Sequence, residues 1–295
     1  TVGLYFAPAI DPNLSREGVV YIGYSSRIIA LSPQSGKVLG MLDRNKTTDP
    51  FVSSPTLSSD GSALFIHSAA GLIFKVLISG NYSRSTDIGN IDMSFDWCCL
   101  YSEFDQDCFF HKRNGSHELD FCSYEVWEAK AAEKGQPLPF RRYDSSAIGS
   151  PYPYATPALY PDDKTLVVTQ YGEGAGAGVY AIAQFLDPYG NTTRMGTSRS
   201  SVAIDMVGNV YAASNVMDGE LNFPALFALN SSLGLRWQAR LGLDGVSLGG
   251  QSPLVSNDST GTGLNGQTII TTVAGVWSLT NGYRIMPMHF LFLWA

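Results

Sequence analysis

The sequence has few charged residues for its length, and it lacks basic runs. Of 295 residues, 15% are Asp, Glu, Lys or Arg, and the formal net charge is −7. Binding to nucleic acid requires a cluster of Lys and Arg that neutralises phosphates, and the sequence shows no such cluster. We therefore exclude nucleic acid as a partner.

Long hydrophobic runs are also missing. The C-terminal segment YRIMPMHFLFLWA (283–295) is apolar, but it is too short to cross a bilayer as a helix, so we expect no membrane span. We predict that it forms a buried closing strand; the remnant of a processed anchor signal and the edge of a subunit interface are the alternatives. The N-terminus has no signal-peptide pattern, so we interpret the chain as a mature secreted form.

Helix-forming patterns are rare, and only residues 125–134 read well as a helix. The chain instead contains 30 Gly and 15 Pro, together with many aromatic and β-branched residues. This composition is typical of short strands joined by tight turns. We predict an all-β fold in one domain over residues 1–295.

The sequence context of the asparagines indicates the cellular compartment of the protein. Seven of the 13 begin an Asn-x-Ser/Thr sequon, whereas composition alone predicts about two. The excess favours N-linked glycans and a eukaryotic secretory route, so we expect a secreted, extracellular protein; the alternative is simple co-occurrence of these polar residues in loops. The sequons begin at Asn13, Asn45, Asn81, Asn114, Asn191, Asn230 and Asn257.

The four cysteines, Cys98, Cys99, Cys108 and Cys122, fall within 25 residues of one another. In a secreted glycoprotein an even number predicts two disulfides. A bridge between the adjacent Cys98 and Cys99 would strain their Cα spacing, so we expect each to pair with Cys108 or Cys122. A zinc site that adds His111 and His117 is the alternative, but the spacing fits no closed tetrahedral pattern.

A repeat runs through the chain. Each copy begins with a small or Pro-containing apolar strand and a turn, followed by two further apolar strands. A fourth strand follows in two copies, and four antiparallel strands per repeat are typical of a β-propeller blade. The five copies begin FAPAIDPN (at 6), SSPTLSSDG (at 53), ATPALYPDD (at 155), SSVAIDMVG (at 200) and QSPLVSNDS (at 251).

The spacing of the copies indicates how many blades to expect. Pro8, Pro55, Pro157, Val202 and Pro253 align, with steps of 47, 102, 45 and 51 residues. Because 102 is twice 51, we predict a divergent, Cys-containing blade within 91–150 and six blades in all, with strands that include DCFFHKR (107–113) and ELDFCSYEV (118–126). Five blades with a disulfide-stapled insertion at 91–150 are the alternative.

Two copies carry a family resemblance. VVYIGYSSRIIALSPQSGKVLG (19–40) and the segment from GNVYAAS to LRWQARLG (208–242) resemble the quinoprotein-like (PQQ-like) repeat, with Trp237 where that family favours Trp. The other copies match less well, and 91–150 does not match. The resemblance implies a β-propeller; the family includes dehydrogenases, scaffolding proteins and sensor domains.

The sequence offers no catalytic constellation. The resemblance raises a quinone-dependent oxidoreductase as a remote alternative, but we find no residue cluster for a quinone and its calcium. The acidic run Asp92, Asp96, Glu103, Asp105 and Asp107 reads as a solvated loop, and His67 as a satisfied or surface imidazole. We expect a non-enzymatic member with no catalytic residues, cofactor or metal.

Two function classes remain. The first is a structural or protein-interaction module, including the repeated subunit of an extracellular assembly or filament, with other subunits or further copies as partners. The alternative is a carbohydrate-binding or carbohydrate-active propeller that uses Trp97, Tyr101 and Trp127. Exposed rings would favour sugar recognition, and buried rings would favour packing.

Overall fold

A computed structural model shows the fold. It describes residues 7–44, 50–69, 72–102, 107–112, 150–151, 155–163, 165–171, 178–183, 192–194, 201–218, 221–240, 252–256, 268–273, 276–279, 282–285 and 289–294. In these residues nearly all regular structure is antiparallel β, which confirms the predicted fold class. The same part of the chain contains no helix of the length and apolarity that a bilayer crossing needs.

The first sheet contains four strands in chain order. A 3-10 turn, η1 (Leu14–Arg16), lies between its first two strands. Residues alternate between the two faces, so that Tyr21, Ile28 and Ala30 are fully buried on one face. The strands are β1 (Ala9–Ile10), β2 (Val20–Tyr24), β3 (Arg27–Leu31) and β4 (Val38–Asp43).

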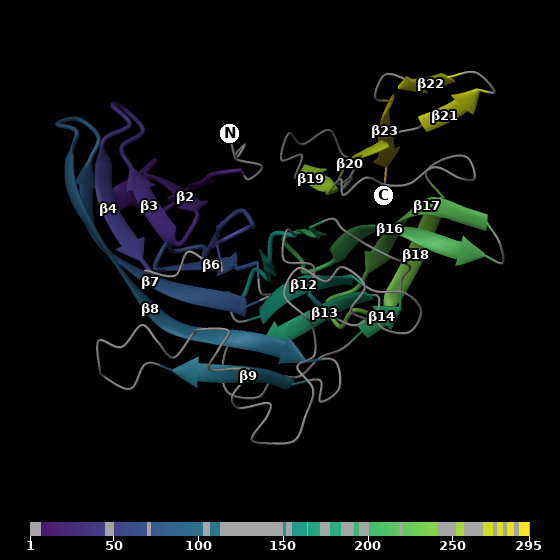
Figure 1. Ribbon diagram of the computed structural model, residues 1–295, viewed down its shortest axis with the longest axis horizontal. Helices are drawn as coiled ribbons and strands as arrows, with labels where there is room; N and C mark the ends of the chain where they lie inside the picture. Colours follow the sequence, from purple (N-terminus) through teal and green to yellow (C-terminus); the bar gives the residue numbers. More distant parts are fainter. Residues whose placement is uncertain are drawn as a thin grey trace.

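The second sheet has five strands, again in chain order. Its strands are β5 (Thr56–Leu57), β6 (Ala63–His67), β7 (Leu72–Ser83), β8 (Ile88–Ser102) and β9 (Asp107–Lys112). All of β6 is buried, as expected for a strand covered on both faces. The β7–β8 hairpin is longer than the repeat predicts, and Figure 1 shows it as a long curved ribbon beneath the first sheet.

The third and fourth sheets follow the same plan. In the third, the short β10 and β11 both pair with β12. Its strands are β10 (Ser150–Pro151), β11 (Ala158–Leu159), β12 (Thr165–Tyr171), β13 (Gly178–Ala183) and β14 (Thr192–Arg194). The fourth contains β15 (Ala203–Ile204), β16 (Val210–Asp218), β17 (Leu221–Leu229) and β18 (Leu235–Arg240).

The last sheet differs from the prediction in its third strand. The repeat predicts that AGVWSLT follows the second strand within the sheet, but this segment forms β21 (Val276–Leu279) and pairs with β22 (Gly282–Ile285) in a separate hairpin. The C-terminal strand β23 (His289–Trp294) takes its place beside β20 (Thr268–Val273), which also pairs with β19 (Leu254–Ser256). The C-terminal segment therefore completes the last sheet.

The sheets follow one another in chain order around a common centre (Figure 1). The short first strands lie innermost, because β1 contacts β5, β5 contacts β11, β11 contacts β15, and β15 contacts β19. Successive sheets that pack face to face around such a centre are the architecture of a β-propeller.

The described part of 91–150 is arranged differently from the predicted sixth blade. DCFFHKR does form a strand, but β9 is added to the edge of the second sheet through β8. The second and third sheets are direct neighbours at the centre, where Thr56 Oγ1 donates to the carbonyl of Pro157 at 2.5 Å. The described part of 91–150 therefore extends the second sheet, and the number of blades stays a prediction. ELDFCSYEV and the predicted helix at 125–134 lie outside the described residues.

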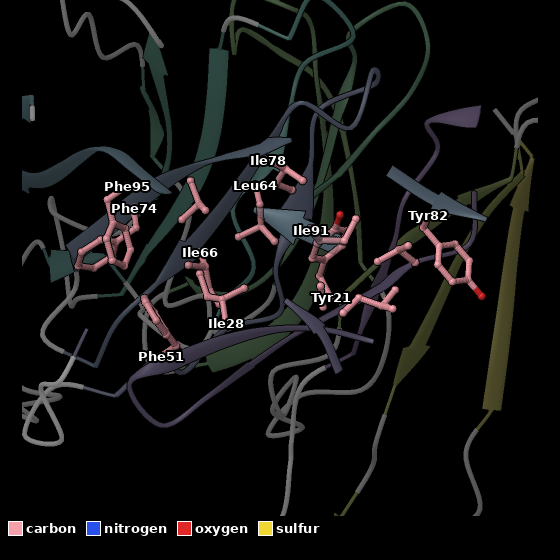
Figure 2. Packing of buried hydrophobic residues seen from close by; sticks show 14 of the residues in the cluster. Tyr21, Ile28, Phe51, Leu64, Ile66, Phe74, Ile78, Tyr82, Ile91 and Phe95 are labelled. Atoms are coloured by element: carbon pink, nitrogen blue, oxygen red, sulfur yellow. The ribbon is translucent and has the colours of Figure 1, made fainter. Parts of the chain in front are cut away.

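Apolar layers hold neighbouring sheets together. One core lies between the first and second sheets, where Figure 2 shows Tyr21 and Ile28 together with Phe74 and Phe95. The rings of Phe74 and Phe95 are 5.6 Å apart at their centroids. A second core lies between the third and fourth sheets. Burial of this kind is the main stabilising contribution to the fold.

Gly40 in β4 lies at a close approach between the first and second sheets. A Cβ atom there would overlap the carbonyl group of Ile91 in β8, and a backbone group cannot move aside cheaply. We expect Gly40→Ala to lower the free energy of unfolding by about 3 kcal/mol, measured by urea denaturation. Gly36→Ala is the control: its Cβ would meet open space, so only the positive φ of 70° should cost about 1 kcal/mol. Equal losses in the two variants would contradict the close packing.

Candidate functional site

Several buried polar groups that could take part in catalysis or ligand binding lie where two sheets meet. Asp11 and Arg16 are buried, and Arg16 Nε lies 2.9 Å from Asp11 Oδ2. Tyr21 donates its hydroxyl to the same carboxylate oxygen at 2.8 Å. Arg16 also donates to the carbonyl groups of Gly61 and Gly80 in the second sheet. This Asp11–Arg16–Tyr21 cluster joins the first two sheets.

Burial is the main cause of the raised pKa of Tyr21, and the negative charge of Asp11 adds to it. The phenol therefore stays protonated and keeps donating to Asp11. A carboxylate that is already bound by a guanidinium, a phenol and the backbone N–H of Asn13 has little capacity left for a substrate. The geometry supports a structural role for the cluster.

The fourth sheet repeats half of this arrangement. Asp205 is buried, and it accepts from Tyr211 at 3.2 Å and from the side-chain amide of Asn209 at 2.7 Å. Burial and the charge of Asp205 raise the pKa of Tyr211 to about 12. The shared sequence signal is AID followed by VY on the next strand, which occurs in these two copies of the repeat. Sequence reasoning missed this pair, although the signal was available.

His67 occupies the junction between the second and third sheets. It is fully buried, and Nδ1 lies 2.9 Å from the carbonyl oxygen of Ala155. A carbonyl only accepts, so Nδ1 carries the proton; Nε2 has no hydrogen-bond partner among the described residues. Burial lowers the pKa of His67 to about 4. The surface alternative is therefore wrong, and the imidazole is satisfied at Nδ1 but not at Nε2.

A second set of bonds links the sheets just before their innermost strands. Thr156 N donates to Ser201 Oγ at 2.7 Å, and Ser201 N donates to Ser252 Oγ at 2.9 Å. Ala7 N makes the equivalent bond to Ser54 Oγ at 2.8 Å. These donors and acceptors all occupy the position before the aligned Pro or Val of the repeat. One position of the repeat therefore links neighbouring sheets three times.

Ser201 contributes its hydroxyl to one junction and its backbone N–H to the next. We expect Ser201→Ala to lower the free energy of unfolding by about 1 kcal/mol, because the N–H of Thr156 loses its acceptor. Ser85→Ala, at an exposed serine, should change it by less than about 0.5 kcal/mol. Chemical denaturation of both variants measures the difference. A Ser201→Ala effect no larger than the control would show that the bond does not join the sheets.

A pocket of about 330 Å³ opens where the third and fourth sheets meet. Tyr160 is the buried aromatic residue in its wall, and its hydroxyl donates to the carbonyl of Ser231 at 3.2 Å. Met206 and Val207 also line the pocket, and each is 73% exposed. A concave site with exposed apolar side chains is suited to taking up an apolar group of a partner.

The sequon asparagines within the described residues differ in their exposure and hydrogen bonding. Asn13 caps η1, and its Nδ2 donates to the carbonyl of Asp60. Asn81 is exposed on β7, not in a turn. Asn230 is exposed, and its Oδ1 accepts from the backbone N–H groups of Ser232 and Gly234. The four sequons that lie outside the described residues begin at Asn45, Asn114, Asn191 and Asn257.

The cysteines are only partly placed. Cys98 and Cys99 are in β8, Cys108 is in β9, and Cys122 lies outside the described residues. The register pairs Cys99 with Phe110 and Tyr101 with Cys108, so β8 and β9 bring three of the four cysteines into one pair of strands. The two disulfides and their connectivity stay predictions.

The acidic run is dispersed rather than gathered. Asp92 and Asp96 are in β8 instead of a loop, and Asp96 forms an ion pair with Lys75 at 2.9 Å. Glu103 and Asp105 lie outside the described residues. Within the described residues no group of three or more His, Cys, Asp or Glu could hold a metal ion. The sugar-binding alternative stays a prediction, because it depends on Trp97, Tyr101 and Trp127, whose side chains are not among those that the structure describes.

No protein-family model matches the sequence, and no curated protein matches it. Solved structures are similar in fold. Hydrazine synthase from Kuenenia stuttgartiensis is 10% identical with a TM-score of 0.50, over 95% of this chain and 58% of that chain. The Dos1 propeller is 11% identical (TM-score 0.43), over 86% and 50%. BamB from Moraxella catarrhalis is 12% identical (TM-score 0.39), over 96% and 76%.

These identities concern the fold alone. The chain spans less than two thirds of the hydrazine synthase and Dos1 chains that it matches. Together with the order of the sheets around the centre, the likeness identifies the chain as a β-propeller.

Proposed function

We propose that the protein is a secreted, N-glycosylated β-propeller of the PQQ-like repeat type that acts as a structural or protein-interaction module. One observation carries the proposal. Buried charged groups that could do chemistry are engaged in structural hydrogen bonds, within a sheet for Asp11 and Asp205 and between sheets for Arg16, while apolar residues are left exposed on the outside. A rigid frame with apolar contact points suits protein association better than catalysis.

The pocket between the third and fourth sheets is a contact point of this kind. Met206 and Val207 project from a turn, so they can enter a partner's surface without any rearrangement of the frame. Buried apolar anchors surrounded by polar residues provide most of the affinity in protein interfaces. An extracellular partner, including another copy of the chain, fits this surface.

The proposal is tested on protein secreted from eukaryotic cells. Mass spectrometry of glycopeptides should show glycans at Asn81 and Asn230, whose side chains are exposed. Chemical cross-linking in the conditioned medium should then capture a protein partner, and Met206→Glu or Val207→Glu should reduce that cross-link. Unmodified asparagines would contradict the secretory assignment. Turnover of a sugar or an alcohol by the purified protein would contradict the non-enzymatic role.

A further inference from the structure

The first sheet has one apolar face that stays exposed among the residues that the structure describes. Antiparallel pairing places Ile22, Ile29 and Met41 in one row across three strands, and Ile10 and Val38 lie in the neighbouring row. We call these five residues and Tyr24 the open face. Ile10 is 66% exposed, and Val38 and Met41 are each 54% exposed. Exposed apolar residues in contiguous rows mark an interaction surface more often than scattered ones do.

The corresponding face is covered in the second and fourth sheets. Leu57 occupies the position of Ile10 in the second copy of the repeat, and it packs against the core shared with the first sheet. Ile204 occupies it in the fourth copy and packs against the core shared with the third sheet. This face of the repeat is therefore built to receive the preceding sheet of a propeller.

The charge on the open face does not oppose association. Arg27 and Asp43 lie at its edge, and Arg27 Nε is 2.6 Å from Asp43 Oδ2. The two charges compensate each other, so a second molecule with the same net charge of −7 meets a locally neutral, apolar surface. A sheet with the repeat's own chemistry is the complementary partner.

The last sheet of the chain is the element with that chemistry. It follows the fourth sheet through the contact between β15 and β19, and its position leaves Ile10 largely exposed. We propose that the open face is the docking site for the last sheet (β19, β20 and β23) of a second copy. The inference rests on the proposed function, because it names the chain itself as a partner. Such a contact joins two different surfaces, so it repeats from copy to copy and builds either a closed ring or an open filament.

Light scattering of the purified glycoprotein over a range of concentrations tests the inference. The wild type should form species larger than a monomer, and Met41→Glu or Val38→Glu should weaken association by about tenfold or more, because a carboxylate would be buried in an apolar contact. Leu235→Glu is the matched control, since Leu235 is 53% exposed and lies in β18 of the fourth sheet, away from the open face. It should leave association within about twofold of the wild type.

Oxidative footprinting of the wild type supplies a readout that does not depend on a variant's folding. In the assembly Met41 should be protected from peroxide, although it is 54% exposed in the single chain. A monomer with protected Met41 would show that the chain's own last sheet covers the face, and a monomer with oxidised Met41 would show that nothing does; either result overturns the inference. A glycosylated monomer that cross-links to a different protein would refute it and leave the proposed function standing.

Discussion

Asp11→Ala should lower the free energy of unfolding by about 3–5 kcal/mol, the largest effect expected of a single side chain in this protein. The substitution leaves Arg16 buried without its carboxylate partner, and it also removes the acceptor of Tyr21. Urea denaturation followed by far-ultraviolet circular dichroism measures the loss.

Asp43→Ala is the matched control for this prediction. Asp43 also pairs with an arginine, but Arg27 is half exposed, and exposed ion pairs contribute less than about 1 kcal/mol. Combining Asp11→Ala with Arg16→Met should recover part of the stability, because no unpaired charge remains buried. Similar losses for Asp11→Ala and Asp43→Ala would show that the cluster does not hold the first two sheets together.

His67 should make the stability of the protein depend on pH. The folded protein holds His67 neutral with a pKa of about 4, whereas the unfolded chain protonates it near its ordinary pKa of 6.5. The native state is therefore fully favoured above pH 6.5 and loses about 3 kcal/mol as the pH falls from 6.5 towards 4. Below about pH 4 both states are protonated, and His67 causes no further loss.

Denaturation curves between pH 4 and 8, compared with those of His67→Asn, isolate this contribution. An asparagine can place its amide nitrogen near the position of Nδ1 and donate to Ala155, but it does not titrate. The variant should be less stable than the wild type at pH 8, and the difference should shrink as the pH falls. A constant difference across the range would mean that His67 titrates normally in the folded protein.

Local patterns predicted much of the fold. The Pro and Asp-Gly turns, together with short runs such as VVYIGY and ALFIH, placed the first two strands of the sheets correctly, because these hairpins form between neighbours in sequence. The long-range pairings were harder. The partners of β9 and β23 depend on which sheet edge is available, and neither composition nor period specifies that edge.

The junction chemistry was predictable only in part. Asp11 with Tyr21 and Asp205 with Tyr211 share a repeated signal in the sequence, so a comparison of the repeats could have found both pairs. His67 carries no such signal, because its partner Ala155 is 88 residues away and belongs to another sheet. Its burial follows from the packing of the second sheet against the third.

The β-propeller arrangement depends on this direct contact between the second and third sheets. A density map that separates neighbouring strands, about 4.7 Å apart, tests the contact most directly. We expect sheets arranged radially around one centre, with the backbone N–H of Ser59 in the second sheet donating to Asp163 in the third. A map with another sheet between these two residues, or with two sheets packed as a sandwich, would contradict it.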